Sequence, residues 1–273
     1  MTLRIILPTE ESNTAYHASR AWGSTLISTF LTSPRLAHEI ISGRYRPKET
    51  AAMQFGSRFH ALLDPGSGFG LRYRCGPDVD RRTKAWQAAE AESKAAGIEL
   101  IPADEWAALH AMAASVAANP IALSLLEGAE HEVGFRIEAP QGAFQVQCRA
   151  DILHRWNHIA DIKTTADVDE FARSIPTWGY HRQAALYRWI ISHACNNISL
   201  PFRFIVVEKA PPLYRCRVIE LDDDYLDIGW REVGAALADI GRRTESGDWD
   251  DHRDAEVVSP PSWLLQRLRA EAA

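Results

Sequence analysis

Two hydrophobic periods divide the chain at about residue 131. Before that point apolar residues recur at helical spacing, and the pattern predicts helices over residues 21–43, 51–63, 83–97 and 103–127. Ser33-Pro34 interrupts the first segment and predicts the start of a second helix. After residue 131 apolar and polar residues alternate, which is typical of strands with two unlike faces. The chain therefore predicts helices followed by a sheet.

The alternating region predicts an antiparallel meander with one apolar and one polar face. Its three strands are expected at Glu132–Ala139, Phe144–Ile152 and Ile159–Thr165, with a turn at Pro140-Gln-Gly142. In the second strand the even-numbered residues, from Phe144 to Ile152, are assigned to the apolar side, and the odd-numbered ones to the polar side. The polar side is then expected to hold Glu132, Asp151, Asp161 and Lys163.

The elements after the meander complete the predicted fold class. We expect a helix from Pro176 to about Ala194, strands at Phe202–Glu208 and Tyr214–Leu221, and helices at Asp224–Arg243 and Trp263–Ala270. Gly66–Asp80 is interpreted as a loop or a short irregular strand. This order predicts an α+β or α/β core. We expect a single domain over residues 1–273, with a mainly helical part (20–130), a core (131–245) and a tail (246–273).

Composition narrows the class of protein. No apolar run approaches the roughly 18 to 20 residues of a membrane span, and the N-terminus has too short an apolar stretch for a signal peptide. The cysteines form no CxxC pair, which argues against a zinc or iron–sulfur site; they are Cys75, Cys148, Cys195 and Cys216. We therefore expect an intracellular protein with no membrane partner.

The distribution of charge leaves nucleic-acid binding open. The net charge of -6 argues mildly against a duplex-binding protein, but binding depends on where the charges lie. Basic residues cluster in two stretches: Arg44, Arg46 and Lys48, and then Arg72, Arg74, Arg81, Arg82 and Lys84. Either cluster could instead be an ordinary solvated face.

The candidate chemistry centres on Asp161-Ile-Lys163. Side chains at i and i+2 of a strand share a face, and Asp151 on the neighbouring strand would add a second carboxylate. Two carboxylates and an ammonium can hold a hard divalent metal and activate water against a phosphodiester. The alternative is a solvent-facing ion pair. Apolar residues around Asp161 favour burial, and a buried acid needs a partner or a metal.

Two further signals depend on packing. Gln183 and Tyr187 lie four residues apart and therefore share one helical face; such side chains can orient a phosphate, contact a backbone or stack on a base. His60, in the predicted helix at 51–63, becomes a candidate ligand only if that helix packs beside the meander. Otherwise His60 is a structural histidine.

These residues occur in an order that resembles the PD-(D/E)XK nuclease superfamily. More closely, the chain is similar to the RecE-type exonucleases (exodeoxyribonuclease VIII) over roughly residues 20–220. The matching segments are Gly56-Ser-Arg-Phe-His60, Glu132, Cys148-Arg-Ala-Asp151, Asp161-Ile-Lys-Thr-Thr165 and Gln183-x-x-x-Tyr187. The chain departs in two places, where Ala150 replaces the family's proline and Asp161 replaces a common glutamate. Both changes leave strand geometry and hard-cation binding available.

The resemblance implies a restriction-endonuclease-like core, a mixed central sheet flanked by helices, with extra N-terminal helices. It also implies a metal-dependent exonuclease that digests linear double-stranded DNA, 5′-to-3′, in phage-type recombination. Asp151 and Asp161 would bind Mg²⁺ or Mn²⁺ with the Ile162 carbonyl, and Lys163 would act on the attacking water. Glu132 and His60 would support the metal, while Gln183 and Tyr187 would position DNA. Independently of the resemblance, the second basic cluster makes Arg81 and Arg82 the expected contacts to DNA phosphates.

The family likeness further implies partners and a location. A homo-oligomeric ring around DNA, a single-strand annealing protein as partner, and the cytoplasm of a bacterium or phage-infected cell are expected on this basis. Two alternatives stay open: a non-catalytic DNA-binding accessory module of recombination, and an endonuclease of the same superfamily. The intact acid–acid–lysine set argues against the accessory module.

Overall fold

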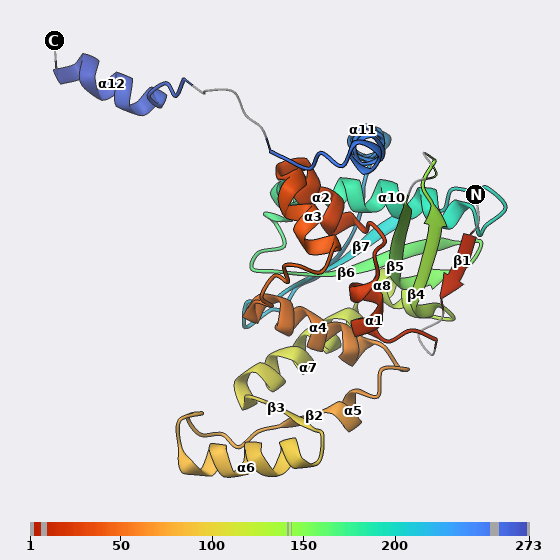
Figure 1. Ribbon diagram of the computed structural model, residues 1–273. Coiled ribbons are helices and arrows are strands. Elements are labelled where there is room, and N and C mark those ends of the chain that lie inside the picture. Colours follow the sequence, from red (N-terminus) through yellow and green to blue (C-terminus); the bar gives the residue numbers. More distant parts are fainter. Residues whose placement is uncertain (1–2, 7–9, 141, 143, 252–256, 272–273) are drawn as a thin grey trace.

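A mixed six-stranded sheet forms the centre of this computed structural model, which describes residues 3–6, 10–140, 142, 144–251 and 257–271 (Figure 1). The strand order is β1-β4-β5-β6-β7-β8. The strands are β1 (Leu3–Ile6), β4 (Glu130–Glu138), β5 (Gln145–His154), β6 (His158–Thr165), β7 (Phe202–Glu208) and β8 (Cys216–Glu220). Among the described strands of this sheet, β6 and β7 are the one parallel pair. Parallel neighbours need a crossover, which two helices supply.

Helices cover both faces of this sheet. The N-terminal helices are α1 (Asn13–Ala18), α2 (Ser24–Thr32), α3 (Pro34–Ile41), α4 (Ala51–Leu63), α5 (Phe69–Arg72), α6 (Lys84–Ala95), α7 (Ala103–Ala118) and α8 (Pro120–Leu126). The C-terminal ones are α9 (Phe171–Trp178), α10 (Tyr180–Ser192), α11 (Asp223–Ser246) and α12 (Ser262–Glu271). The predicted class, a mixed sheet flanked by helices with extra N-terminal helices, is confirmed.

Two hydrophobic clusters, one on each face, show that the expected polar face was wrong. One cluster joins the sheet to α2, α10 and α11, and the other joins it to α4, α7 and α8. Ala150 packs in the first cluster and Ile152 in the second, so the predicted common side for these two residues is also wrong. A strand that alternates regularly would put them on one side; the backbone of β5 is therefore irregular at Asp151.

Local chemistry explains where three predicted elements differ from the structure. The helix predicted at 103–127 breaks at Asn119, whose side chain caps α8 ahead of Pro120. The helix predicted from Pro176 begins earlier and divides at Gly179, which has a φ of 71°. The segment Gly66–Asp80, predicted as a loop or a short irregular strand, contains α5 and the short strand β2 (Tyr73–Cys75), which pairs with β3 (Glu99–Ile101).

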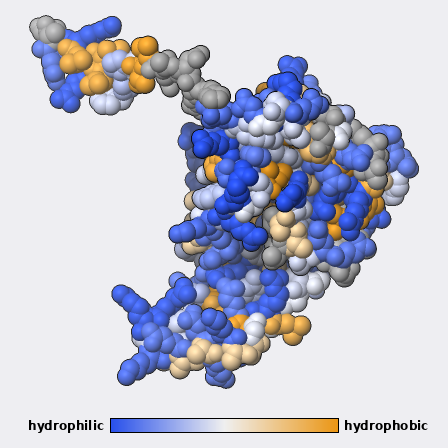
Figure 2. Space-filling view, in the orientation of Figure 1, coloured by the Kyte–Doolittle hydropathy of each residue, from blue (hydrophilic) through white to orange (hydrophobic). Residues whose placement is uncertain are grey.

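A segment after α11 fastens the helices that precede the sheet. Trp249 stacks on His38 of α3 at a ring distance of 4.4 Å and on Trp22 at 6.0 Å. Asp251 accepts hydrogen bonds from the Ser33 hydroxyl and the Arg35 N–H at the start of α3. α2 and α3 are thus held by residues near the far end of the chain. Beyond them, α12 stands apart from the body (Figures 1 and 2).

Among the described residues, no single helix is both long enough and apolar enough to cross a membrane. α7 and α8 meet that test only as a pair, and they are bent by 94° at the break between them.

Candidate active site

Three carboxylates meet where the sheet opens between β4, β5 and β6. β5 and β6 pair from His154–His158 to Ile152–Ala160, and the pairing stops before the next opposed residues, Asp151 and Asp161. β4 and β5 pair on both sides of Glu132 but not at Glu132, which would lie opposite Asp151. Glu132 has a φ of 54°, a backbone conformation that is uncommon outside glycine and asparagine and is often found at functional sites.

Ile162 connects the two halves of this opening through its backbone. Its N–H donates to Oδ2 of Asp151 at 2.8 Å, and its carbonyl accepts from Nε2 of His60 in α4 at 2.9 Å. The other ring nitrogen of His60, Nδ1, lies 3.4 Å from Oδ2 of Asp151. α4 therefore packs beside the sheet. This is the condition on which the sequence made His60 a candidate ligand.

Asp161 is held by a cation and an amide. Its side chain is 3% exposed; Oδ2 pairs with Nζ of Lys163, and Oδ1 accepts from Nε2 of Gln183 at 2.6 Å. Gln183 lies near the start of α10, so the helix that crosses between β6 and β7 reaches the acid directly. Lys163 is 18% exposed, and its ammonium lies 4.9 Å from the centre of the Tyr180 ring, where a cation is stabilised.

Burial and crowding shape the protonation of these groups. The pKa of Asp151 is raised to about 7, first by burial and then by the charge of Asp161. Burial is also the main reason that the pKa of Glu132 is raised. Burial acts to lower the pKa of Lys163, but Asp161 and then Asp151 outweigh it, so that this pKa is raised. Carboxylates crowded in this way are stabilised by a cation.

The donor set fits a hard divalent cation. One ligand atom each from His60, Glu132 and Asp151 lie within 4.8 Å of one another, and carboxylate and carbonyl oxygens are what Mg²⁺ and Mn²⁺ prefer. Asp161 belongs to the neighbouring group with Lys163 and Gln183. The structure thus brings the predicted residues together in two adjoining sets, with Ile162 between them.

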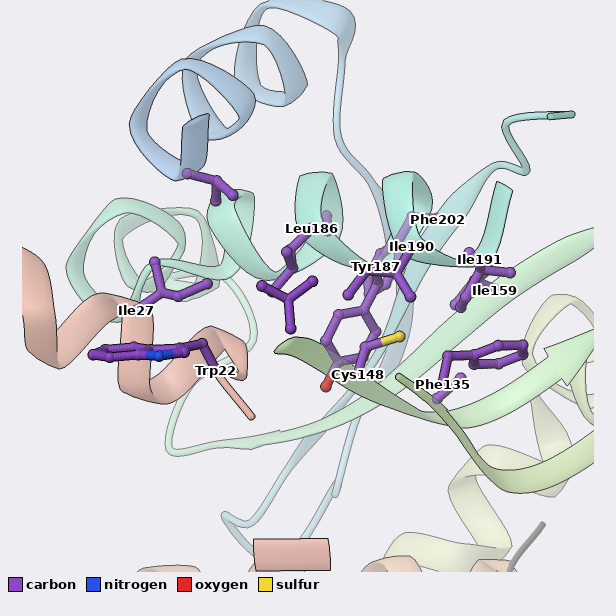
Figure 3. Packing of buried hydrophobic residues seen from close by; sticks show 14 of the residues in the cluster. Trp22, Ile27, Phe135, Cys148, Ile159, Leu186, Tyr187, Ile190, Ile191 and Phe202 are labelled. Atoms are coloured by element: carbon purple, nitrogen blue, oxygen red, sulfur yellow. The ribbon is translucent and has the colours of Figure 1, made fainter. Parts of the chain in front are cut away.

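An open cleft of about 550 Å³ leads from Lys163 and Gln183 along α2 and the start of α10. Tyr187 also lines it, but is 8% exposed and packs edge-on against Phe202. Figure 3 shows its ring beside Cys148 and Phe202 in the layer between α10 and the sheet. Only the part of Tyr187 at the cleft is available for contact.

Arg81 and Arg82 are placed away from this cleft. They precede α6 in the lobe that extends from the body (Figure 1). Arg81 lies 3.9 Å from Glu90, and Arg82 pairs with Asp80 at 3.0 Å. The structure does not bring them to the three carboxylates. Arg81 and Arg82 could therefore contact only a ligand long enough to extend from the carboxylates to this lobe.

Residues that the sequence did not single out also line the cleft. They are Arg182 and a set of serine and threonine residues on α2: Ser24, Thr25, Ser28, Thr29 and Thr32. The spacing of the α2 residues over two turns is a signal that could have marked one helical face. No comparable pattern surrounds Arg182, because its partners come from distant parts of the chain.

Comparison with known proteins identifies the family and the fold. The family described as a PDDEXK-like domain of unknown function (DUF3799) matches residues 23–255. A solved structure of a "putative exonuclease" from Eubacterium rectale is similar at a TM-score of 0.66 and 15% identity, covering 96% of this chain and 97% of that one. LHK-Exo in complex with dAMP gives a TM-score of 0.29 and 18% identity, covering 80% and 98%. No curated protein matches the chain.

The family match spans most of the chain and includes every candidate residue of the opening in the sheet. The Eubacterium rectale structure shows the same fold over nearly the whole of both chains. The resemblance to the PD-(D/E)XK superfamily is therefore confirmed, and the chain belongs to the PDDEXK-like domain family.

Proposed function

We propose that this protein is a metal-dependent DNA nuclease that digests linear double-stranded DNA from its ends, in the 5′-to-3′ direction. The observation that carries the proposal is the arrangement of Asp151, Asp161 and Lys163 around Ile162, because these groups provide both a cation site and an ammonium beside it. Membership of a PDDEXK-like family supports hydrolysis of nucleic acid. The exonuclease mode and its polarity rest on the likeness to RecE-type enzymes.

Asp151, Glu132 and His60 would hold Mg²⁺ or Mn²⁺, with Asp161 completing the acidic surroundings. A cation bound there would supply charge that polarises a phosphoryl oxygen and lowers the pKa of water. His60 would contribute Nδ1, because its Nε2 donates to the Ile162 carbonyl, which can only accept. The Ile162 carbonyl would then orient His60, which is the metal ligand, without contacting the metal itself.

Lys163 and Gln183 prepare the reacting centre from the protein side. Lys163 keeps its proton, because the neighbouring carboxylates raise its pKa. Its ammonium can orient an attacking water and offset charge that develops on the phosphate. Gln183 holds one oxygen of Asp161 and leaves the other to Lys163, so both side chains keep Asp161 in a single orientation.

Two other functions use the same fold. A non-catalytic DNA-binding module of recombination needs no acid–acid–lysine set, and the compact grouping around Ile162 disfavours it. An endonuclease of the superfamily would use the same residues on an uninterrupted duplex. A ring-shaped oligomer, an annealing-protein partner and action in the cytoplasm of a bacterium or phage-infected cell belong to the proposal through the RecE likeness.

One assay separates the three functions. Linear and covalently closed circular duplexes of the same sequence are incubated with the full chain and Mg²⁺, with EDTA as control. Loss of the linear form alone supports the exonuclease, and cutting of both forms supports the endonuclease. Binding without any cutting would overturn the proposal in favour of the accessory module. Labels at the 5′ or 3′ ends then give the direction of digestion.

A further inference from the structure

The cleft beside Lys163 differs in charge from the chain as a whole. The chain has 36 acidic and 30 basic residues, yet among the residues that the structure describes the cleft is lined by two cations and no carboxylate. The cations are Lys163 and Arg182, and the hydroxyl face of α2 lines the same space. Cations and hydroxyl donors together suit a ligand whose charged oxygens only accept hydrogen bonds, such as phosphate.

Arg182 is fixed in this cleft by contacts on two other helices. Nη1 donates to Oε2 of Glu232 in α11 at 2.6 Å, and Nε donates to Oγ of Ser28 in α2 at 3.2 Å. The side chain is only 16% exposed. Among the described residues, Nη2 has no hydrogen-bond partner. An arginine that is already positioned loses little side-chain entropy when it binds an anion.

Glu232, which holds Arg182, is itself supported. Nε2 of His181 lies 3.2 Å from the same Oε2. Burial acts to raise the pKa of Glu232, but hydrogen bonds from Arg182 and His181 outweigh it and lower the pKa. α11 can approach α10 this closely because Gly229 has no side chain: a Cβ there would lie 2.4 Å from the carbonyl oxygen of His181.

Resting on the proposed nuclease function, we propose that Arg182 binds a phosphate of the strand that is cut. This phosphate is not the scissile phosphate itself but another one on the same strand. Gln183, the next residue, donates to Asp161, whereas Arg182 contacts Ser28 and Glu232. The guanidinium therefore lies to the side of the catalytic carboxylates. Nη2 and the α2 hydroxyls are the donors for that phosphate. Arg182 is a positioning residue, because anchoring one phosphate fixes which neighbouring bond meets Asp161.

The competing explanation is that Arg182 only ties α10 to α11 and α2. A structural tie contributes to the melting temperature, but it does not release counterions when DNA binds. The dependence of affinity on salt counts phosphate contacts directly. This readout therefore separates a phosphate ligand from a structural ion pair.

The test measures binding of a single-stranded oligonucleotide in Ca²⁺ across a range of salt concentrations. Arg182→Gln keeps hydrogen-bond donors for Glu232 and Ser28 but removes the charge. Arg188→Gln is the matched control, because Arg188 lies on the same helix and donates to the Leu200 carbonyl at 3.0 Å. We expect Arg182→Gln to bind about tenfold more weakly, with a log–log salt slope shallower by about 0.7, the value of one phosphate contact. Arg188→Gln should match the wild type.

An Arg182→Gln slope equal to those of wild type and Arg188→Gln would overturn the proposal. If Arg182→Gln does not fold, Arg182→Lys replaces it: the charge stays, so the slope should hold while affinity falls through loss of the planar fork. Unchanged affinity in Arg182→Lys would also overturn the proposal. Should the wild type cut no DNA while Arg182→Gln still flattens the slope, the nuclease function fails and the phosphate subsite stands.

Discussion

His60 and Ile162, 102 residues apart in the chain, are joined by a hydrogen bond of 2.9 Å between the imidazole Nε2 and the backbone carbonyl oxygen. A carbonyl cannot donate, so Nε2 carries the proton and Nδ1 is left facing Asp151. In a neutral imidazole this bond leaves the lone pair on Nδ1, which faces the carboxylates. The predicted His60 and Ile162 ligands are thus coupled, with one orienting the other.

Replacing His60 by alanine should therefore weaken metal binding more than it lowers stability. We expect Mn²⁺ affinity, measured by calorimetric titration, to fall by at least about 10- to 100-fold, because losing only the orienting partner of a ligand costs that much and His60 is itself a proposed ligand. His110→Ala is the control, since His110 is exposed and packs on Trp106. Unchanged Mn²⁺ affinity with a lower melting temperature would show that His60 is only structural.

Replacing Lys163 by methionine should remove most hydrolysis and keep metal binding. Methionine can fill the space beside the Tyr180 and Phe204 rings, over which the Lys163 ammonium lies, but it carries no charge. We expect a rate at least about 100-fold lower, the usual effect of losing one charge-stabilising donor. Lys209→Met, which removes a cation near Phe55 instead, should keep the rate. Parallel loss of Mn²⁺ affinity in Lys163→Met would assign the lysine to the metal site.

The pKa of Asp151 predicts how stability depends on pH in the absence of metal. This pKa is raised from 3.8 to about 7 in the folded protein. Between these values the unfolded chain has released a proton that the folded chain still holds, so stability falls as pH rises from about 4 to about 7. Asparagine does not ionise, so Asp151→Asn should not show this fall in stability between about pH 4 and pH 7. In EDTA its melting temperature should exceed that of the wild type at pH 8, and the gap should close toward pH 4.

A gap of constant size at all pH values would contradict this origin. It would mean that asparagine changes packing or hydrogen bonding rather than relieving a buried charge.

Replacing Asp161 should destabilise the protein, unlike Asp151→Asn. Asp161 is the carboxylate that pairs with the largely buried Lys163, and an unpaired cation in such a place is costly. Asp161→Asn should therefore melt at a lower temperature than wild type in EDTA, and it should be inactive. A double variant with Lys163→Met should recover part of the missing stability. Additive losses in the double variant would show that the two side chains do not stabilise each other.

The basic cluster before α6 is expected to lengthen the interface with duplex DNA. Joint replacement of Arg81 and Arg82 by alanine should make the salt slope for a linear duplex shallower, by about 0.9 for each phosphate that the variant no longer neutralises. Arg242→Ala is the control, because Arg242 is similarly exposed and pairs with Asp239. If the double variant has the same salt slope as Arg242→Ala, Arg81 and Arg82 do not contact the bound DNA.

Local sequence patterns were sufficient for β4 to β8 and for the shared side of Asp161 and Lys163, because alternation on a strand acts over two residues. They did not predict β1 or β3, which have only four and three residues. The irregular backbone at Glu132 and Asp151 could not be read in this way. A positive φ at glutamate has no signature in the sequence, and it depends on how three strands separate. Arg182 was missed for a related reason, since its meaning depends on Glu232 and Ser28, which only the packing of α10 between α2 and α11 brings together.

The Trp249 segment has a consequence for the order in which the molecule is assembled. α2, whose hydroxyl face lines the cleft, is secured by Trp249 and Asp251, which a ribosome makes only after all the strands of the sheet. Contacts between such distant parts of a chain form late, because a long loop must close first. The nascent protein therefore holds its sheet and acidic residues before the cleft wall is secured. The proposed nuclease activity should accordingly appear only after the Trp249 segment has been made and has docked on α2 and α3.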